Sequence, residues 1–342
     1  MGGGVVGRSL VRALARAGLE ATLVADGGPA ASHVPVALLN PHRGRTGRAH
    51  PGDLDALATT WRWATQLEAE GFAPGAHRTG VVRVADGPKQ ARGFASAGLA
   101  ATDAGAAGVR APYGAFLVPD GGWLDPEAWL GALTRSAQGH GARLRDGCAV
   151  AAERRPGGGW RLHLRDADAA TLGHGARRSE RAGTLDADQV VFATGAAPWP
   201  VAMVAAFGPE PLLERTAGDV VVTRHPAPSL PIAGGTYVGP VGRDAERVAA
   251  IGGHHRPPGP PAEDTATRLR AAARWALPGL GDADPHDRVW WGVRAKLPSA
   301  RPEVRVLAPG VRWVGGFAGR GFLAAAAFAE EVVAGLTDEV GR

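Results

Sequence analysis

Apolar residues near the start of the chain recur with helical spacing. Val6, Leu10 and Leu14 lie four residues apart, so they would share one face of a helix that Gly18 ends. Residues 21–25, ATLVA, are short and apolar, as in a strand, and Asp26 follows them directly. The pattern therefore predicts a helix and then a strand within the first 26 residues.

Helical and strand patterns alternate along the rest of the chain. Helices are predicted over 53–71, after Asp125 with Pro126 at the first position, after Asp264 as N-cap, and from the glycine-bearing loop before Phe322 onward. The apolar face expected for the helix at 53–71 consists of Leu54, Leu57, Trp61, Ala64 and Leu67. Strands are predicted at 79–85, 115–118, 142–145, 148–155, 161–165, 190–194, 219–224, 236–241, 247–253, 288–294, 304–307 and 311–317.

Two further segments indicate how the chain is organised. Residues 190–194, VVFAT, are apolar on both faces, as in a covered parallel strand, so the chain leaves a nucleotide-binding sheet and returns to it. The polar residues 166–183 predict an exposed loop. A length of 342 residues exceeds the usual limit for one core, so two domains with a shared interface are expected.

The composition narrows the function classes. The formal net charge is +5, but acidic residues are interspersed with the arginines and no basic block alternates with aromatic residues. A nucleic-acid surface is therefore not indicated by charge alone. The single cysteine, Cys148, excludes an internal disulfide, and the histidines, including His254 and His255, lack a partner set with metal-ligand spacing, so no metal is expected.

No targeting or membrane segment is predicted. The late apolar stretch FLAAAAFA is too short to span a bilayer, and a glycine turn occupies the position where a signal peptide would lie. The sequence therefore predicts a soluble, cytoplasmic protein.

The first residues carry the turn G-x-G-x-x-G, formed by Gly2, Gly4 and Gly7. In a dinucleotide-binding unit these glycines make the tight turn, admit the pyrophosphate and allow close packing of helix on strand. Asp26 lies 22 residues after Gly4, which suits a carboxylate that binds a ribose hydroxyl. The alternative is a glycine-rich start without a ligand, because 51 glycines make chance matches common; the ordered helix, stop, strand and acid favour a nucleotide.

Six segments in order resemble the D-amino-acid oxidase superfamily of FAD-dependent enzymes. They are GGGVVGRSLVRALARAGLEATLVAD, GGWLDPEAWLGAL, VVFATGA, TYVGPV, WWGVRAKLP and GGFAGRGFLAAAAFAEE. The likeness is strongest to the glycine oxidase and sarcosine oxidase branch, and it extends to the FAD domain of the tRNA enzyme that acts on a modified methylaminomethyl wobble uridine. It covers essentially the whole chain.

The resemblance implies an α/β fold with a Rossmann-type FAD-binding domain, interleaved with an α+β substrate domain on a mixed or antiparallel sheet. The FAD-binding domain would comprise residues 1–50, 121–205 and 296–342, and the substrate domain 51–120 and 206–295. The cofactor-binding residues it implies are Gly2, Gly4, Gly7, Asp26, Val150, Thr194, Gly195, Gly316, Phe317, Gly319, Gly321, Phe322 and Leu323. Val150 would contact adenine through its backbone, and the segment from Phe317 to Leu323 would line the flavin ring.

The strand that should precede Gly2 is missing, although it would be the central strand of the nucleotide sheet. We therefore expect the native protein to begin upstream, with a short extension that ends in an apolar strand. Without such an extension, weak flavin binding would be expected.

For the substrate, the resemblance implies that Arg294 pairs with a carboxylate and that Tyr237 assists it, with Arg320 as a second cationic candidate. A guanidinium fork suits a carboxylate through two parallel hydrogen bonds. The plainer alternatives are an ordinary ion pair for Arg294, packing for Tyr237 and a loop brace for Arg320. Of Trp290 and Trp291, one is expected to border the site and the other to fill the sheet core.

The expected activity is oxidation of a C–N bond in a small amino acid or secondary amine, with FAD as hydride acceptor and oxygen as the final acceptor. The sequence departs from the family pattern after Arg294, where Lys296 and Arg301 add positive charge. That charge favours a more anionic or larger substrate. The alternatives are a tRNA-modifying oxidase and a non-catalytic flavin-binding protein.

Overall fold

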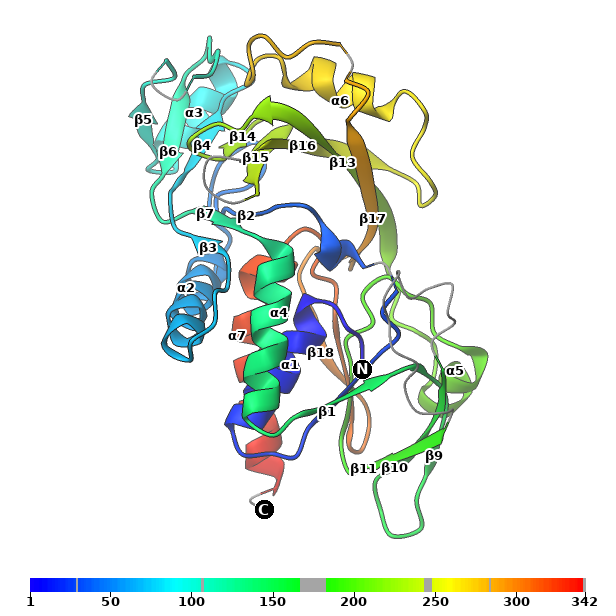
Figure 1. The fold of residues 1–342 in the computed structure, drawn as a ribbon. Helices are drawn as coiled ribbons and strands as arrows, with labels where there is room; N and C mark the ends of the chain where they lie inside the picture. The colour runs from blue at the N-terminus through cyan, green and yellow to red at the C-terminus, as the bar shows by residue number, and fades with distance from the viewer. Residues whose placement is uncertain (29, 106–107, 167–182, 243–247, 283, 341–342) are drawn as a thin grey trace.

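The chain folds into two layers that face each other in a computed structural model (Figure 1). The structure describes residues 1–342 apart from 29, 106–107, 167–182, 243–247, 283 and 341–342. A large curved sheet forms the upper layer in Figure 1, and helices packed on smaller sheets form the lower layer. The expected loop at 166–183 lies almost wholly outside the described residues.

The lower layer contains two parallel strand pairs that lie side by side. β1 (Thr22–Ala25) pairs with β8 (Arg143–Asp146), and β12 (Val190–Phe192) pairs with β19 (Val311–Gly315). β18 (Glu303–Ala308) adds an antiparallel edge to β19. The parallel pairing of β12 agrees with its apolar character on both faces.

Met1 and Gly2 bridge these two strand groups. The main-chain nitrogen of Gly2 donates to the carbonyl of Val24 in β1 at 2.9 Å. On the other side, the Met1 nitrogen donates to the Val191 carbonyl at 2.7 Å, and the Met1 carbonyl accepts from Ala193 at 2.8 Å. The first two residues therefore occupy the central position of this layer's sheet, between β1 and β12.

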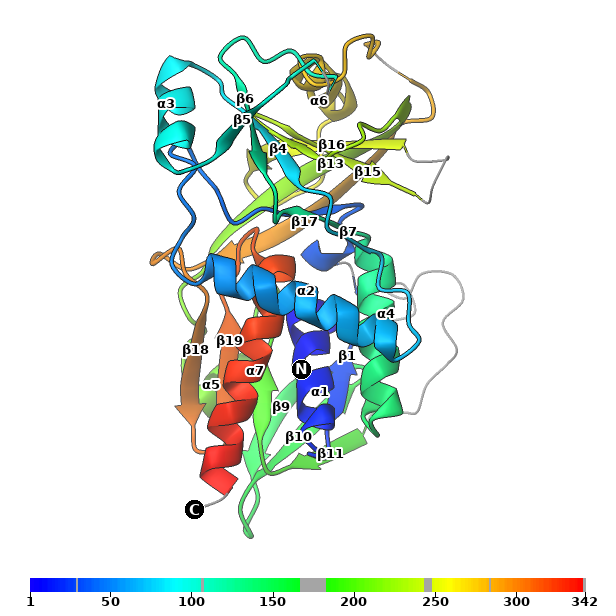
Figure 2. The ribbon, with the colours of Figure 1, turned by 90° about the vertical axis from the view of Figure 1, so that its left-hand side faces the viewer.

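Helix α1 (Val5–Arg16) lies between α4 (Pro126–Gly139) and α7 (Gly321–Val340), and α2 (Asp53–Ala69) crosses them (Figure 2). Because neighbours pack on several sides of α1, its buried residues include Val11 and Ala15, while Val6 and Leu14 are only partly buried. The prediction of one apolar stripe was therefore too narrow. In α2 the prediction was wrong at Leu54, which is exposed.

The upper layer is one eight-stranded mixed sheet in the order β17-β13-β16-β15-β14-β4-β6-β5, antiparallel except between β14 and β4. Its strands are β4 (Val81–Val84), β5 (Ala100–Thr102), β6 (Ala115–Val118), β13 (Glu214–Pro226), β14 (Ile232–Ala233), β15 (Tyr237–Val241), β16 (Val248–Arg256) and β17 (Arg288–Lys296). α6 (Thr265–Ala273) covers the outer face through Leu269 and Ala273, which pack on Val221 and Ile251. The inner face packs Val220, Ala250 and Trp290 toward the lower layer.

Smaller elements complete the chain. They are η1 (Ala31–His33), the sheet of β2 (Ala37–Leu39), β7 (Gly122–Leu124) and β3 (Ala76–His77), α3 (Pro88–Ser96), the antiparallel sheet of β9 (Cys148–Arg154), β10 (Trp160–Arg165) and β11 (Gly183–Ala187), and α5 (Val201–Phe207). Asp125 caps α4 as predicted, since its carboxylate accepts from the nitrogen of Ala128. Asp264 stands at the N-cap of α6, but its carboxylate pairs with Arg268 at 3.3 Å instead of capping the helix.

Candidate active site

The glycine turn has the geometry that its spacing predicts. Gly2 has φ +110°, and a Cβ there would overlap the carbonyl oxygen of Ala193. A Cβ at Gly7 would overlap the carbonyl oxygen of Gly2, so the first turn of α1 packs directly on the loop before it. Both positions exclude any larger residue, which leaves bare main chain at the start of α1. A helix N-terminus of this kind offers N–H groups to phosphate.

Ser32, in η1, stands at the same helix end and was not predicted from the sequence. Its hydroxyl accepts from the main-chain nitrogen of Val5 at 2.9 Å. A Cβ at Gly4 would lie 3.1 Å from that hydroxyl oxygen. Ser32 thus satisfies one of the N–H groups that a phosphate could bind. It follows Asp26 in a segment without periodicity, so only its position in the fold reveals it.

The other predicted nucleotide residues lie around this turn or beside β1. A Cβ at Gly2 would lie 3.3 Å from the nitrogen of Thr194, so the segment after β12 adjoins the turn. Gly195 has φ +62°. Asp26 is exposed just past β1, where its carboxylate accepts from the nitrogen of Gly28 at 3.1 Å. Val150 is partly buried in β9.

The last predicted cofactor segment meets the first one. Gly316 has φ +80° and Ala318 has φ 50°, and the Ala318 nitrogen donates to the Ala295 carbonyl at 2.8 Å, which ties this loop to β17. α7 begins at Gly321, where a Cβ would lie 3.1 Å from Cγ1 of Val5 in α1. The N-termini of α1 and α7 are therefore adjacent, as one dinucleotide bound at both would require.

Arg294 and Tyr237 share the inner face of the large sheet. Arg294 is opposite Thr216 in β13, and Tyr237 is opposite Gly252 in β16, and these registers place both side chains on the face of Trp290. A Cβ at Gly218 would lie 2.9 Å from Nη2 of Arg294. A Cβ at Gly252 would overlap the Tyr237 ring. The two glycines let both side chains lie flat across the sheet.

His255 lies beside Arg294, although from the sequence it was considered only as a metal ligand and was not placed in the substrate site. Arg294 donates to Nδ1 of His255, which is opposite Gly218 in the same sheet. Among the described residues, Arg294 has no ion pair with a carboxylate. Burial lowers the pKa of Arg294 and raises the pKa of Tyr237 to about 12, so near neutral pH the guanidinium is charged and the phenol keeps its proton.

Arg320, Lys296 and Trp291 do not share the inner-face position of Arg294 and make other contacts. Nη2 of Arg320 donates to the carbonyl of Ala300 at 2.6 Å, and its Nη1 lies 3.7 Å from Asp53. These contacts agree with the alternative of a loop brace. Lys296 pairs with Glu214 at 2.9 Å. Trp291 faces away from the site with 38% of its surface exposed, and Arg256 lies over its ring.

Arg43 joins the site from the loop after β2. Its Nε donates to the Asn40 carbonyl at 3.1 Å, and its Nη2 donates to the Gly319 carbonyl at 3.1 Å. A Cβ at Gly319 would lie 3.4 Å from Nη1 of Arg294 and 3.7 Å from Nη1 of Arg43. Nothing in the sequence pattern around Arg43 singles it out.

Within the described ranges, no three or more His, Cys, Asp or Glu side chains gather closely enough to hold a metal ion. In the same part of the chain, every helix is too short or too polar to cross a bilayer.

Known proteins resemble this chain over nearly all of its length. Glycine oxidase from Geobacillus kaustophilus has TM-score 0.79 and 21% identity, covering 99% of this chain and 93% of that one. Iminodiacetate oxidase from Chelativorans sp. BNC1 has TM-score 0.75 and 18% identity, with 99% and 94% covered. At these identities the likeness shows a shared fold.

A curated relative is the tRNA 5-methylaminomethyl-2-thiouridine biosynthesis bifunctional protein MnmC of Maricaulis maris. It is 28% identical over 347 residues, covering 98% of this chain and 51% of that protein, so the chain spans about half the length of this relative. The FAD dependent oxidoreductase family, DAO, matches residues 1–334. The adjoining helix ends and the bare glycine turn fit its cofactor, and the chain is an FAD-dependent oxidoreductase of the DAO family.

Proposed function

We propose that the protein oxidises the C–N bond of a small amine or amino acid whose carboxylate is bound by Arg294. The observation that carries this proposal is the position of the Arg294 guanidinium, which lies on the inner face of the large sheet and against Gly319 in the loop before α7. A carboxylate on Arg294 would therefore lie beside the segment proposed to line the flavin ring.

The proposed cofactor residues divide into three groups, one for each part of FAD. Gly2, Gly4 and Gly7 would hold the pyrophosphate, with Thr194 and Gly195 beside it. The flavin ring of FAD would lie on the loop from Gly316 to Leu323. Asp26 and Val150 would lie toward the adenosine at the opposite end of FAD. FAD, when bound, supplies the acceptor for the hydride that leaves the substrate carbon.

The protein's own part is binding and orientation. The Arg294 fork can donate two parallel hydrogen bonds to one carboxylate, which fixes the neighbouring carbon in one orientation. Tyr237 keeps its proton up to about pH 12, so its hydroxyl can donate to the same carboxylate. Trp290 and Val220 line the face and keep water away from it. The amine substrate would react in its neutral form, giving an imine that water hydrolyses, with oxygen as the final electron acceptor.

The test is anaerobic mixing of the FAD-loaded protein with glycine, sarcosine, proline and D-amino acids. Bleaching of the flavin absorbance by at least one amine, and peroxide release in air, are expected. Binding of FAD without bleaching by any amine or by modified tRNA would contradict the proposal and favour a non-catalytic flavin-binding protein.

A second candidate is oxidation of a carboxymethylaminomethyl group on tRNA, favoured by the similarity to the MnmC protein over 98% of this chain. The same Arg294 would bind the carboxylate of that group. Turnover of modified tRNA without turnover of glycine or sarcosine would select this candidate.

A further inference from the structure

Positive charge gathers around Gly319 in excess of what one carboxylate needs. Nη1 of Arg294 and Nη1 of Arg43 both lie in contact range of a Cβ at Gly319, from opposite layers of the fold. Arg320 follows in sequence and is paired with Asp53. Asp53 lies 3.7 Å from Arg320 and also attracts the charge of Arg43, but within the described residues neither Arg43 nor Arg294 forms an ion pair with a carboxylate.

Arg43 is held in place before any ligand binds. Arg83 donates to the carbonyls of His42 and Gly44, the latter at 3.0 Å. These hydrogen bonds fix the main chain on both sides of Arg43. The Asn40 side chain accepts from the His42 nitrogen at 2.9 Å. A loop fixed by this many hydrogen bonds presents its arginine in one position, which lowers the ordering cost of binding.

Arg43 also retains free donor capacity. Its Nε and Nη2 are bound to carbonyls, whereas Nη1 has no hydrogen-bond partner in the part of the chain that the structure describes. Burial, with repulsion from Arg320, Arg294 and Arg83 against attraction by Asp53, lowers the pKa of Arg43 to about 10, so it stays charged near neutral pH. A partly buried cation with an open N–H is most readily satisfied by an anion.

We propose that Arg43 and Arg294 bind two different anionic groups of one substrate, so that the preferred substrate is a small amine with two carboxylates. This proposal rests on the proposed function for the role of Arg294. One carboxylate lies on Arg294 beside the reacting carbon, and the second reaches Nη1 of Arg43 across Gly319. Gly319 itself places no side chain against either guanidinium group.

The test measures ligand binding to the FAD-loaded protein by the change in flavin absorbance, with acids that cannot be oxidised. Glutarate and butyrate form a matched pair, because they differ by the second carboxylate. Glutarate is expected to bind roughly 10- to 100-fold more tightly, the usual worth of a charge-assisted hydrogen-bonded pair. The variant Arg43→Gln is expected to lose this preference, because it weakens the binding of glutarate more than the binding of butyrate.

Two variants separate the charge from the geometry. Arg45→Gln removes one positive charge from an exposed position in the same loop and is expected to keep the wild-type preference. Arg43→Lys keeps the charge without the fork, and it is expected to retain part of the preference.

The proposal is overturned by equal binding of the two acids to the wild type, or by an Arg43→Gln protein that still prefers glutarate. It is also overturned if Arg43→Gln shifts the ligand-free flavin spectrum or FAD affinity and leaves the preference intact, because Arg43 would then serve the cofactor. If the protein prefers glutarate but oxidises no amine, the proposed function is wrong, whereas the binding site for two anionic groups is still supported.

Discussion

The two ends of the proposed flavin site are built in different ways. At the α1 end the proposed contacts come from main-chain N–H groups, and side chains are excluded at Gly2 and Gly7. At the other end they come from side chains on separate strands and loops, Arg294, Tyr237 and Arg43, which meet only after folding. A site made of backbone is therefore continuous in sequence, whereas a site made of side chains is assembled from distant segments.

The largest effect is expected at the backbone end. Gly7→Ala places a methyl group on the carbonyl oxygen of Gly2, so either the turn or the helix must shift. The phosphate-binding N–H groups would move, and nearly complete loss of bound FAD is expected, measured as flavin absorbance per protein after purification. Gly335→Ala in α7 is the matched control: among the described residues its Cβ would meet nothing within 4 Å, and FAD content should be unchanged.

The next effect tests the side-chain end alone. Arg294→Gln should lower kcat/KM for the best amine by about 30- to 1000-fold, because a charge-assisted pair with the substrate carboxylate is lost. FAD content should stay normal. Arg288→Gln, an exposed arginine on the same strand, serves as control. Equal kinetics for Arg294→Gln and the wild type would contradict the carboxylate role.

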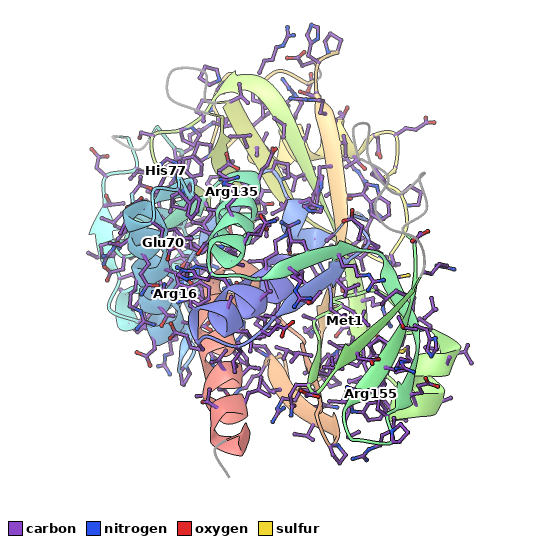
Figure 3. The ribbon with its side chains drawn as sticks, turned by 60° about the horizontal axis from the view of Figure 1, so that its bottom comes forward. Met1, Arg16, Glu70, His77, Arg135 and Arg155 are labelled. Atoms are coloured by element: carbon purple, nitrogen blue, oxygen red, sulfur yellow. The ribbon has the colours of Figure 1, made fainter. Side chains whose placement is uncertain are left out.

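The scaffold under the glycine turn gives a third test. Arg12 in α1 is buried and pairs with Glu70 at 3.0 Å, and the Ser136 hydroxyl also donates to Glu70. Figure 3 shows Glu70 beside Arg16, which forms a second ion pair with it. Burial raises the pKa of Glu70, but Ser136 and Arg12 outweigh it and lower the pKa overall. Glu70→Gln leaves a buried charge unpaired and should reduce the free energy of unfolding by about 2–4 kcal/mol.

The acid dependence of this pair has a definite sign. Since the folded-state pKa of Glu70 lies below its unfolded value of 4.5, its stabilisation is present above about pH 4.5 and is lost as pH falls further. Urea titrations at several pH values should show the wild type approaching Glu70→Gln in acid. A constant difference at all pH values would contradict the ion pair.

The smallest effect is expected at Tyr237. Tyr237→Phe removes one neutral hydroxyl and should lower kcat/KM by about 3- to 10-fold without changing FAD content. Because burial raises the folded-state pKa of Tyr237 from 10 to about 12, its contribution to stability is present below pH 10 and lost between about pH 10 and 12. The difference in unfolding free energy between the wild type and this variant should therefore change only in that range.

Local sequence patterns mark some parts of the candidate site, whereas other parts come together only in the folded chain. The glycine turn, the end of α1 near Gly18 and the position of Asp26 directly after β1 were predictable, since their spacing alone carries the geometry. The role of Asp26 at the ribose stays a prediction. Arg294 and Tyr237 were identified through family resemblance, and their common face depends on strand register. Arg43, His255 and Ser32 were missed because each contacts residues far away in the chain, with no local pattern to mark it. Leu54 was wrongly placed on a buried face because helical spacing does not say how far a neighbouring element extends.

We propose that one FAD molecule extends from the main chain at the start of α1 to the loop before α7, beside Arg294 of the large sheet. A crystal structure of the FAD-loaded protein with glutarate tests it most directly. We expect phosphate oxygens on the N–H groups at the start of α1, the flavin ring beside the loop from Gly316 to Leu323, and one carboxylate on Arg294. Phosphates bound away from Gly2 and Gly7, or glutarate bound away from Arg294, would contradict it.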